Sequence, residues 1–219
     1  MKTDHRLIEK LRRSLEGPLP GHDALPEVSG YRRPNPHKVL QRDPPPREGA
    51  VLVLIYPRED VLHTLLMLRP VYEGVHSGQI SFPGGKKEEQ DRSLEETALR
   101  EFNEETGAMS DEILVLGRLS PIFIPPSDVV VTPVMAYSTA VTGFDPDPNE
   151  VAELIETPLA DLLQRDLLRS RKQHVSVLGR ELEVPYYDVK GHVVWGATAM
   201  MIAELRELFH RLGQADRFA

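Results

Sequence analysis

The spacing of apolar residues predicts several β-strands in this chain. Residues 50–56, AVLVLIY, are apolar and rich in β-branched side chains, which is typical of a buried strand. A hairpin is expected where two segments, 173–178 and 181–187, flank Gly179 and Arg180. The other expected strands lie at 61–69, 113–119, 129–141 and 193–195, with a short one inside the segment HSGQISFPGGK.

Other segments have the period of an α-helix. Residues 4–16 carry apolar side chains at helical spacing, and further helices are expected at 93–106, 158–169 and 196–212. The proline-rich segment 17–48 predicts an extended arm that either covers the domain or a partner or forms a flexible leader. Because strands and helices mix without strict alternation, the pattern predicts a mixed β-sheet with helices on its faces.

Composition narrows the classes of function. The chain has 219 residues, of which 40% are apolar and 27% charged, so one domain can fold without disulfides or metal. The absence of cysteine excludes disulfides, cysteine-ligated zinc and thiol catalysis. The formal net charge of −8 disfavours nucleic acids and anionic membranes as partners. An anionic substrate therefore requires a local metal ion or a cluster of arginines.

The N-terminal segment bears on the location of the protein. Its sequence, MKTDHRLIEKLRRSLEG, carries charges throughout and lacks the apolar core of a secretory signal. No stretch approaches the roughly 18 uninterrupted apolar residues of a membrane-spanning helix. The expected location is therefore cytoplasmic, without membrane association.

The helix expected at 93–106 carries an unusual acidic cluster. Ser93 and Glu96 have the spacing of a capping box at its start, and Gly107 follows its end. At about 100° per residue, three glutamates lie on one side of the helix, and the third falls among the apolar positions: Glu101, Glu104 and Glu105. Carboxylates at a core edge repel one another and lose solvation, so stability alone does not favour this arrangement.

Two interpretations of the acidic cluster remain open. The cluster is a solvated face that pairs with Arg100 and nearby lysines, or its oxygens hold a divalent cation with waters and substrate phosphate. The preceding FPGG turn at 82–85 favours the cation, because its glycines bring the backbone close to the helix. The carbonyl of Gly84 or Gly85 is then a further ligand.

Residues 85–108 resemble the Nudix box, whose pattern is G-x5-E-x7-R-E-U-x-E-E-x-G-U, with U a bulky aliphatic residue. The second half of the pattern matches REFNEETGA at 100–108, with Phe102 and Ala108 at the two U positions. The first half differs, because the segment from Gly85 to Arg100 is one residue longer than the pattern. Asp91 stands near the position of the pattern's first glutamate.

The upstream sequence resembles the coenzyme A pyrophosphatases within the Nudix family. The subfamily motif, L-L-T-x-R-S-x3-R-x3-G-x3-F-P-G-G, is similar to residues 65–85. Shorter matches are VTPV at 131–134, NEV at 149–151 and WGATA at 195–199. The motif's threonine, serine and second arginine are replaced by Met67, Pro70 and Gly74.

The resemblance implies a fold and an activity. The fold would be an α+β, Nudix-type α/β/α sandwich with a mixed sheet, in which 1–48 form a helical, proline-rich extension and 49–219 the catalytic domain. The activity would be Mg²⁺- or Mn²⁺-dependent cleavage of coenzyme A or acyl-CoA to 3′,5′-ADP and 4′-phosphopantetheine or its acyl form. The substrate partner would be a small nucleotide, and a homodimer is expected from the resemblance only. The alternatives are another diphosphate, such as ADP-ribose or a dinucleotide, and a non-catalytic ligand-binding module.

The resemblance also assigns roles to single residues. The expected metal ligands are Glu101, Glu104, Glu105 and the carbonyl of Gly85, and Arg100 is expected to brace the carboxylates. The general base is Glu104 or Glu150, which lies in a loop expected to precede a helix. The expected substrate-binding residues are Arg69, His76, Gln79 and Phe82. His192 and Trp195 are expected to be structural, with Trp195 in the core.

Overall fold

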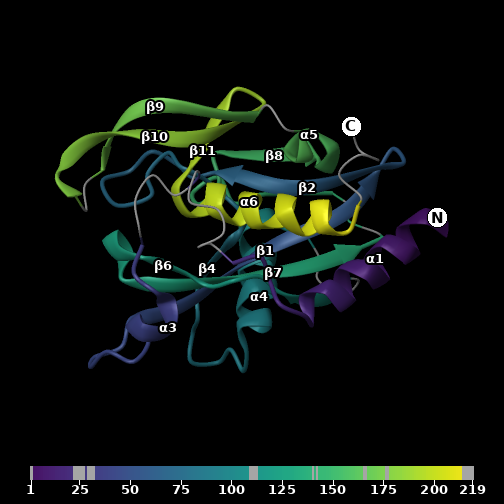
Figure 1. Cartoon of the computed structure of the whole chain (residues 1–219), viewed down its shortest axis with the longest axis horizontal. Coiled ribbons are helices and arrows are strands. Elements are labelled where there is room, and N and C mark those ends of the chain that lie inside the picture. Colours follow the sequence, from purple (N-terminus) through teal and green to yellow (C-terminus); the bar gives the residue numbers. More distant parts are fainter. Residues whose placement is uncertain are drawn as a thin grey trace.

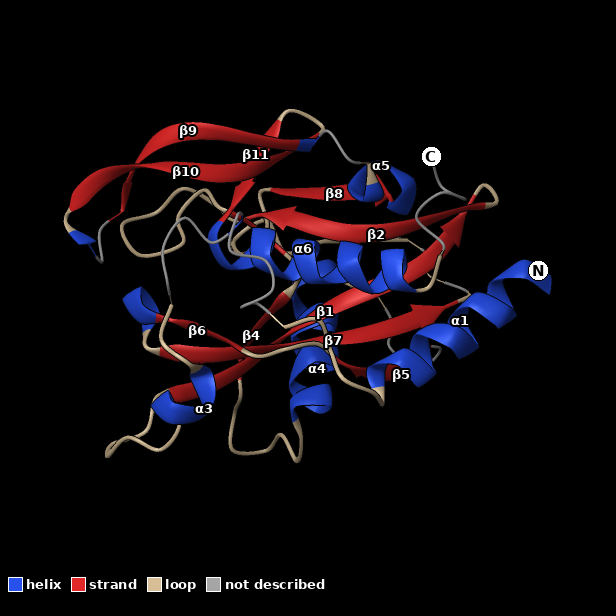
Figure 2. Ribbon diagram, in the orientation of Figure 1, coloured by secondary structure: helices blue, strands red, loops and turns tan. Residues whose placement is uncertain are grey.

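The computed structural model describes residues 2–21, 28, 33–108, 113–139, 141, 143–164, 167–175 and 178–213. These residues form one large mixed sheet and one small antiparallel sheet, with helices packed against them (Figure 1). Eleven strands and five α-helices are described, and the longest helices are α1, α4 and α6 (Figure 2). None of the helices in the described ranges is long and apolar enough to cross a lipid bilayer.

The large sheet has eight strands, and the path β3-β2-β1-β7-β5 runs through it, with β4 paired to β1, β6 to β7 and β8 to β2. Its strands are β1 (Arg47–Arg58), β2 (Val61–Leu68), β3 (Ile80–Ser81), β4 (Gly84–Lys86), β5 (Ile113–Arg118), β6 (Ile122–Ile124), β7 (Val129–Ser138) and β8 (Glu153–Pro158). The small sheet contains β9 (Leu168–Val175), β10 (Arg180–Val189) and β11 (His192–Trp195). The helices are α1 (Lys2–Leu15), α3 (Pro36–Val39), α4 (Leu94–Thr106), α5 (Leu159–Leu163) and α6 (Gly196–Arg211), with one 3₁₀ turn, η2 (Pro125–Ser127).

Strand β1 forms the centre of the molecule. It pairs in parallel with β7 and antiparallel with β2 and β4, and its middle residues are buried on both faces. Because side chains alternate along a strand, one set of β1 residues packs with α4 and the other with α1 and α6. The α4 set is Ala50, Leu52 and Leu54, and the other is Val51, Val53 and Ile55. The expected mixed sheet with helices on its faces is therefore confirmed.

Both ends of α4 are fixed as the sequence predicts. The Ser93 side chain accepts a hydrogen bond from the backbone N–H of Glu96 at the helix start. At the other end Gly107 adopts a left-handed conformation (φ 69°), and its N–H bonds to the carbonyl of Asn103. A Cβ atom at Gly107 would lie 2.3 Å from the carbonyl oxygen of Asp145, so only glycine fits there. These ends set which way the acidic side of α4 faces.

One expected helix is wrong. The helix predicted at 158–169 is confined to α5 (Leu159–Leu163), and the chain re-enters strand conformation at β9 (Leu168–Val175). The apolar spacing of LADLL supports a helix, whereas the polar segment that follows is set by its pairing with β10. Pairing between distant segments thus decides the structure of a sequence that has no clear period of its own.

The sequence also gave no sign of two strands, β6 and β8. Strand β8 pairs with β2 over six residue pairs, from His63↔Pro158 to Leu68↔Glu153. Glu150 therefore precedes a strand rather than the helix that the sequence suggested. The other expected strands and helices in the described ranges are present, with ends shifted by a few residues.

A buried carboxylate connects the N-terminal arm to the body of the protein. Glu204 on α6 is fully buried and accepts hydrogen bonds from the backbone N–H of Gly21 (3.0 Å) and of Ser120 (3.0 Å). The Ser120 hydroxyl donates a third bond at 2.6 Å. The arm is therefore bonded to the body at Gly21. The expected domain boundary at residue 48 stays a prediction.

Removing this carboxylate should destabilise the fold. We expect Glu204→Ala to lower the free energy of unfolding by about 2–4 kcal/mol, because it leaves buried N–H and O–H groups without an acceptor. Urea unfolding followed by circular dichroism measures the effect. Glu207→Ala, on the same helix but partly exposed and paired only with Arg211, is the matched control and should change stability by less than about 0.5 kcal/mol. Equal effects of both changes would contradict the prediction.

Candidate active site

A large cavity of about 1210 Å³ opens between the two sheets. It is lined by β4, by the acidic side of α4, by the end of β9 and by the start of α6. The loop that joins β2 to β3, residues 69–79, forms a further part of its wall. The cavity thus brings together segments that are far apart in the sequence.

Glu105 is the most buried carboxylate of the cavity, with 2% of the residue exposed. Its oxygens accept a 2.6 Å hydrogen bond from the backbone N–H of Gly84 and lie 3.3 Å from Nη2 of Arg69. The same Arg69 nitrogen donates to the carbonyl oxygen of Gly84 at 2.8 Å. Burial raises the pKa of Glu105 to about 7, although Arg69 and the Gly84 N–H oppose the shift.

Glu101 lies directly over Gly85. A Cβ atom at Gly85 would come within 2.4 Å of the Glu101 carboxyl carbon, so the carboxylate occupies the space that any other residue's side chain would need. Burial raises the pKa of Glu101, and the ion pair with Arg100, 3.1 Å away, acts against this. The glycines of the FPGG turn therefore let the acidic side of α4 reach the cavity.

Arg100 connects these carboxylates to the loop before α4. It donates to both oxygens of Asp91 (3.1 and 3.0 Å), to Glu104 (2.9 Å) and to the carbonyl of Lys86 (3.0 Å). Asp91 also accepts hydrogen bonds from the Thr97 hydroxyl at 3.0 Å and from the backbone N–H of Glu88 at 2.9 Å. Asp91, near the first-glutamate position of the motif, therefore holds the Arg100 guanidinium in place.

The two candidate bases occupy different environments. Glu150 lines the cavity, and its negative charge is a minor contribution, after burial, to the raised pKa values of Glu101 and Glu105. Glu104 does not line the cavity; its side chain is 54% exposed and pairs with Arg100. Both residues are exposed, and Glu150 differs from Glu104 in lining the cavity.

The expected metal ligands fit a divalent cation by their chemistry. Carboxylate oxygens and a peptide carbonyl are the ligands that Mg²⁺ and Mn²⁺ take in proteins. In the described ranges, no three acidic or histidine side chains lie close enough together to enclose a metal ion. Among the described residues, Arg69 and Arg100 form ion pairs with the three glutamates. Which oxygens act as ligands stays a prediction.

All four expected substrate residues line the cavity. Arg69 contacts Glu105 as described above, and its backbone N–H donates to the carbonyl of Gln79 at 3.0 Å. The side chains of His76 and Gln79 are 3.1 Å apart, with His76 in a left-handed conformation (φ 71°). Phe82 is only 1% exposed and forms part of the cavity floor. Contact of these residues with substrate remains a prediction.

Several cavity residues were not expected from the sequence. Trp195, expected in the core, is partly exposed and lines the cavity, as do Arg33 from the arm, Arg47 at the start of β1 and Lys86 in β4. Trp195 belongs to the WGATA match at 195–199, which gave it no role in the cavity, and no motif specifies Arg33, Arg47 or Lys86. The apolar run at 50–56, which begins three residues after Arg47, could have placed Arg47 near one end of a buried strand. His192 is placed outside this cavity and lies 3.7 Å from Glu153, and its expected structural role stays a prediction.

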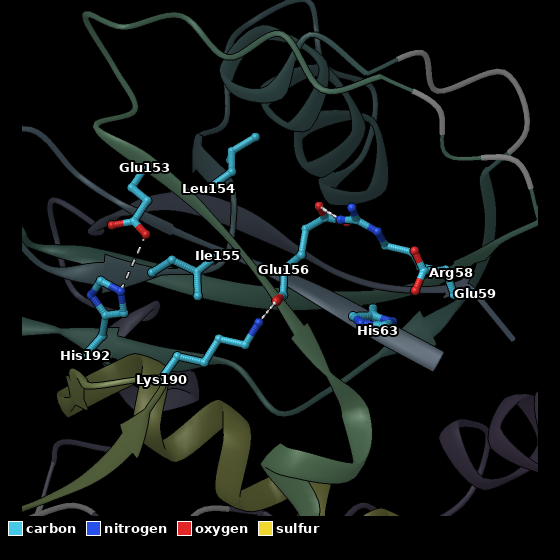
Figure 3. A pocket seen from close by; sticks show the side chains of 9 residues that line it. All are labelled: Arg58, Glu59, His63, Glu153, Leu154, Ile155, Glu156, Lys190 and His192. Carbon is cyan, nitrogen blue, oxygen red and sulfur yellow. Dashed lines mark hydrogen bonds and ion pairs between the residues drawn. The ribbon is translucent and has the colours of Figure 1, made fainter. Parts of the chain in front are cut away.

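A second, smaller cavity of about 480 Å³ lies between β8 and the turn from β10 to β11 (Figure 3). Its charged groups pair among themselves. Glu156 pairs with Arg58, its backbone carbonyl accepts from Nζ of Lys190, and His192 faces Glu153 (Figure 3). The residues that line it include none of the expected catalytic or substrate residues, so the large cavity is the candidate active site.

Comparison with known proteins identifies the family of this site. The model of the NUDIX domain matches residues 46–178. The chain belongs to the Nudix family. Relatives named uncharacterized Nudix hydrolase NudL share 33% identity in Photorhabdus laumondii (77% of this chain, 91% of the relative) and 38% in Pectobacterium atrosepticum (73% and 81%).

Solved structures agree on the Nudix fold. The Nudix hydrolase RenU of M. smegmatis superposes with a TM-score of 0.53 at 18% identity, over 76% of this chain and 87% of that one. A MutT/nudix family protein from Enterococcus faecalis gives a TM-score of 0.50 at 18% identity, over 79% and 67%. The expected Nudix fold and resemblance are therefore confirmed.

The family also settles the general class of reaction. This Nudix chain is a pyrophosphohydrolase that acts on diphosphate substrates, so the prediction of an enzyme is confirmed. Nudix hydrolases use divalent metal ions. The acidic side of α4, which carries the matched motif, is the part of the cavity where such chemistry belongs.

The Asp91–Arg100 pair predicts a dependence of stability on pH. Arg100 holds the pKa of Asp91 well below its ordinary value of about 3.9 by hydrogen bonding. A carboxylate with a lowered folded-state pKa stabilises the protein above the unfolded-state pKa and loses this contribution as the pH falls. We expect Asp91→Asn to lower the free energy of unfolding by about 1–3 kcal/mol at pH 7.

The difference between wild type and Asp91→Asn should shrink below about pH 4, where the unfolded chain takes up the proton first. Chemical unfolding at pH 7, 5 and 3 measures this difference. Glu89→Gln, an exposed change in the same loop, is the control and should have little effect at any pH. A constant difference for Asp91→Asn across this range would contradict the prediction.

Proposed function

We propose that this Nudix enzyme hydrolyses the diphosphate of coenzyme A or acyl-CoA, giving 3′,5′-ADP and 4′-phosphopantetheine or its acyl form. One observation carries the proposal. The segment that resembles the coenzyme A pyrophosphatase motif, residues 65–85, supplies Arg69, which contacts both Glu105 and the carbonyl of Gly84. The motif associated with the substrate is thereby joined to the acidic residues of the Nudix box in one cavity.

In this proposal Glu101, Glu105 and the Gly85 carbonyl, which line the cavity, would hold a divalent cation, Mg²⁺ or Mn²⁺. Glu104, the third expected ligand, pairs with Arg100 outside the cavity and would have to turn away from Arg100 to join them. Such an ion neutralises phosphoryl charge and makes bound water easier to deprotonate. Arg100 keeps Glu101 and Glu104 in place through its bond to Asp91. Arg69 forms an ion pair with Glu105. Its proposed role is to bind a phosphoryl oxygen of the substrate.

The attacking water must lose a proton as it bonds to phosphorus and the diphosphate bond breaks. Glu150 is the proposed acceptor of this proton. It lines the cavity beside Glu101 and Glu105, and within the described ranges it forms no ion pair that would occupy its oxygens. Glu104, the alternative, is held by Arg100 on the outer side of α4.

A second candidate substrate rests on one difference from the subfamily motif. Gly74 replaces the motif's second arginine, which removes a positive charge from the loop that lines the cavity. An enzyme for another nucleoside diphosphate derivative, such as ADP-ribose or a dinucleotide, accounts for that loss without further assumption.

A substrate panel tests the proposed function. With Mg²⁺ or Mn²⁺, coenzyme A should be cleaved with a kcat/KM at least about tenfold above that of ADP-ribose or a dinucleotide, a difference of about 1.4 kcal/mol in transition-state stabilisation. Mass spectrometry should identify 3′,5′-ADP and 4′-phosphopantetheine as products, and EDTA should abolish turnover. If ADP-ribose or a dinucleotide is the better substrate, the coenzyme A assignment is wrong.

The role of Glu150 is tested by Glu150→Gln. Loss of a general base should lower kcat by about 10²–10⁴-fold while KM stays near the wild-type value, because the amide is almost isosteric but accepts no proton. Glu153→Gln makes the same charge change outside the cavity and should leave both constants unchanged. An unchanged kcat in Glu150→Gln would transfer the role to Glu104.

A further inference from the structure

Three cations gather at one end of the large cavity: Arg33, Arg47 and Lys86, called the cationic wall below. Lys86 in β4 is the cross-strand partner of Gly49 in β1, and Arg47 lies two residues before Gly49. The side chains of Lys86 and Arg47 therefore point to the same face of the sheet. Arg33 comes from the N-terminal arm, and its Nη1 donates to the carbonyl of Phe123 at 3.3 Å. These residues concentrate positive charge in a chain whose net charge is −8.

Among the described residues, Arg47 and Lys86 carry no carboxylate partner, although Glu88, which lies 3.8 Å from Arg100, also lines the cavity. Within the described ranges neither residue takes part in an ion pair, and Arg47 donates instead to the carbonyl of Ser127 at 3.1 Å. By contrast, the arginines beside the acidic side of α4, Arg69 and Arg100, both pair with glutamates. The cavity therefore has one paired arginine, Arg69, near its glutamates, and two cations without an ion pair in the described ranges, Arg47 and Lys86, near the start of β1.

The loop between β2 and β3 provides a different kind of surface. Tyr72 and Val75 line the cavity there, with 46% and 49% of each residue exposed. The exposed side chains of this loop can contact an apolar part of a substrate, whereas the cationic wall can bind an anionic group. The diphosphate already has partners in Arg69 and in the proposed divalent ion, so Arg47 and Lys86, which form no ion pair in the described ranges, are available for a further anionic group.

We propose that Arg47 and Lys86, assisted by Arg33, bind a phosphate monoester on the ribose of the substrate and thereby determine specificity. The proposal rests on the proposed function for its nucleotide substrate. A phosphate monoester carries close to two negative charges and accepts charge-assisted hydrogen bonds from several donors at once. The subfamily motif has an arginine in the loop where this chain has Gly74. Arg47 and Lys86, which lie on the sheet, would provide positive charge in place of that arginine.

Binding of product-like nucleotides tests the cationic wall without turnover. Calorimetric titration should show that wild type binds 3′,5′-ADP at least about tenfold more tightly than 5′-AMP. Arg47→Gln and Lys86→Gln should each weaken 3′,5′-ADP binding by about 10–100-fold and leave 5′-AMP unchanged, as expected for loss of a charge-assisted hydrogen bond. Titration with 2′,5′-ADP shows which ribose position is recognised.

Lys87→Gln is the matched control. It removes one charge at the next position, whose side chain leaves the opposite face and does not line the cavity, so it should leave both affinities unchanged. Arg33→Gln extends the test to the arm, with its unfolding temperature measured alongside. Equal binding of 3′,5′-ADP and 5′-AMP by wild type would overturn the proposal. Equal weakening of both nucleotides in Arg47→Gln and Lys86→Gln would also do so, because it would place the cations on the 5′-phosphate.

Turnover of coenzyme A and dephospho-coenzyme A separates this inference from the proposed function. The wild-type preference for coenzyme A should collapse in Lys86→Gln because kcat/KM falls for coenzyme A alone. If Arg33→Gln, Arg47→Gln and Lys86→Gln all keep the preference for coenzyme A over dephospho-coenzyme A, the proposed role of the cationic wall is wrong. The proposed function is not affected by that result. If wild type cleaves neither compound but still prefers 3′,5′-ADP in the titration, the proposed function fails and the phosphate site stands.

Discussion

The arrangement of the active-site cavity depends on the burial of one carboxylate. Glu105 lies inside the protein, yet its oxygens meet a backbone N–H and an arginine rather than water. Burying a charge without such partners is costly, so the FPGG turn, β2 and α4 must keep fixed relative positions for the fold to tolerate it. The same contacts place Arg69, Gly84 and Gly85 at the cavity edge, where the diphosphate chemistry of a Nudix hydrolase occurs.

The arginines explain how three acidic residues coexist on one helix. Arg100 forms ion pairs with both Glu101 and Glu104, and Asp91, in the loop before α4, holds Arg100 in place. The positive charge of Arg100 therefore reduces the repulsion between the two carboxylates. Arg69, the first residue after β2, forms the corresponding ion pair with Glu105. The pKa values of Glu101 and Glu105 are raised because the effect of burial exceeds that of the two arginines. A divalent cation would therefore stabilise the ionised form of both carboxylates further.

The sequence predicted the parts of the fold that have a local cause. Strand β1 has a continuous apolar run, and α4 has Ser93 and Gly107 at its ends, so both were predicted with nearly correct bounds. The mistakes fall where pairing between distant segments decides, as in β8 and β9, whose side chains have no strong period. The three glutamates and Arg69 were predicted from motifs, whereas Arg33, Arg47 and Lys86 enter the cavity only through the fold, and Trp195 had been expected in the core.

The walls of the cavity extend beyond the segment that matches the NUDIX domain, 46–178. Arg33 reaches in from the N-terminal arm, and Trp195 and the first turn of α6 close another side. Glu204, also on α6, bonds to the arm at Gly21, so the same helix both lines the cavity and fixes the arm. The catalytic motif can therefore stay constant while the arm and α6 change the shape and charge of the cavity. Selectivity for one diphosphate substrate over another is expected to depend on those outer segments as much as on the glutamates.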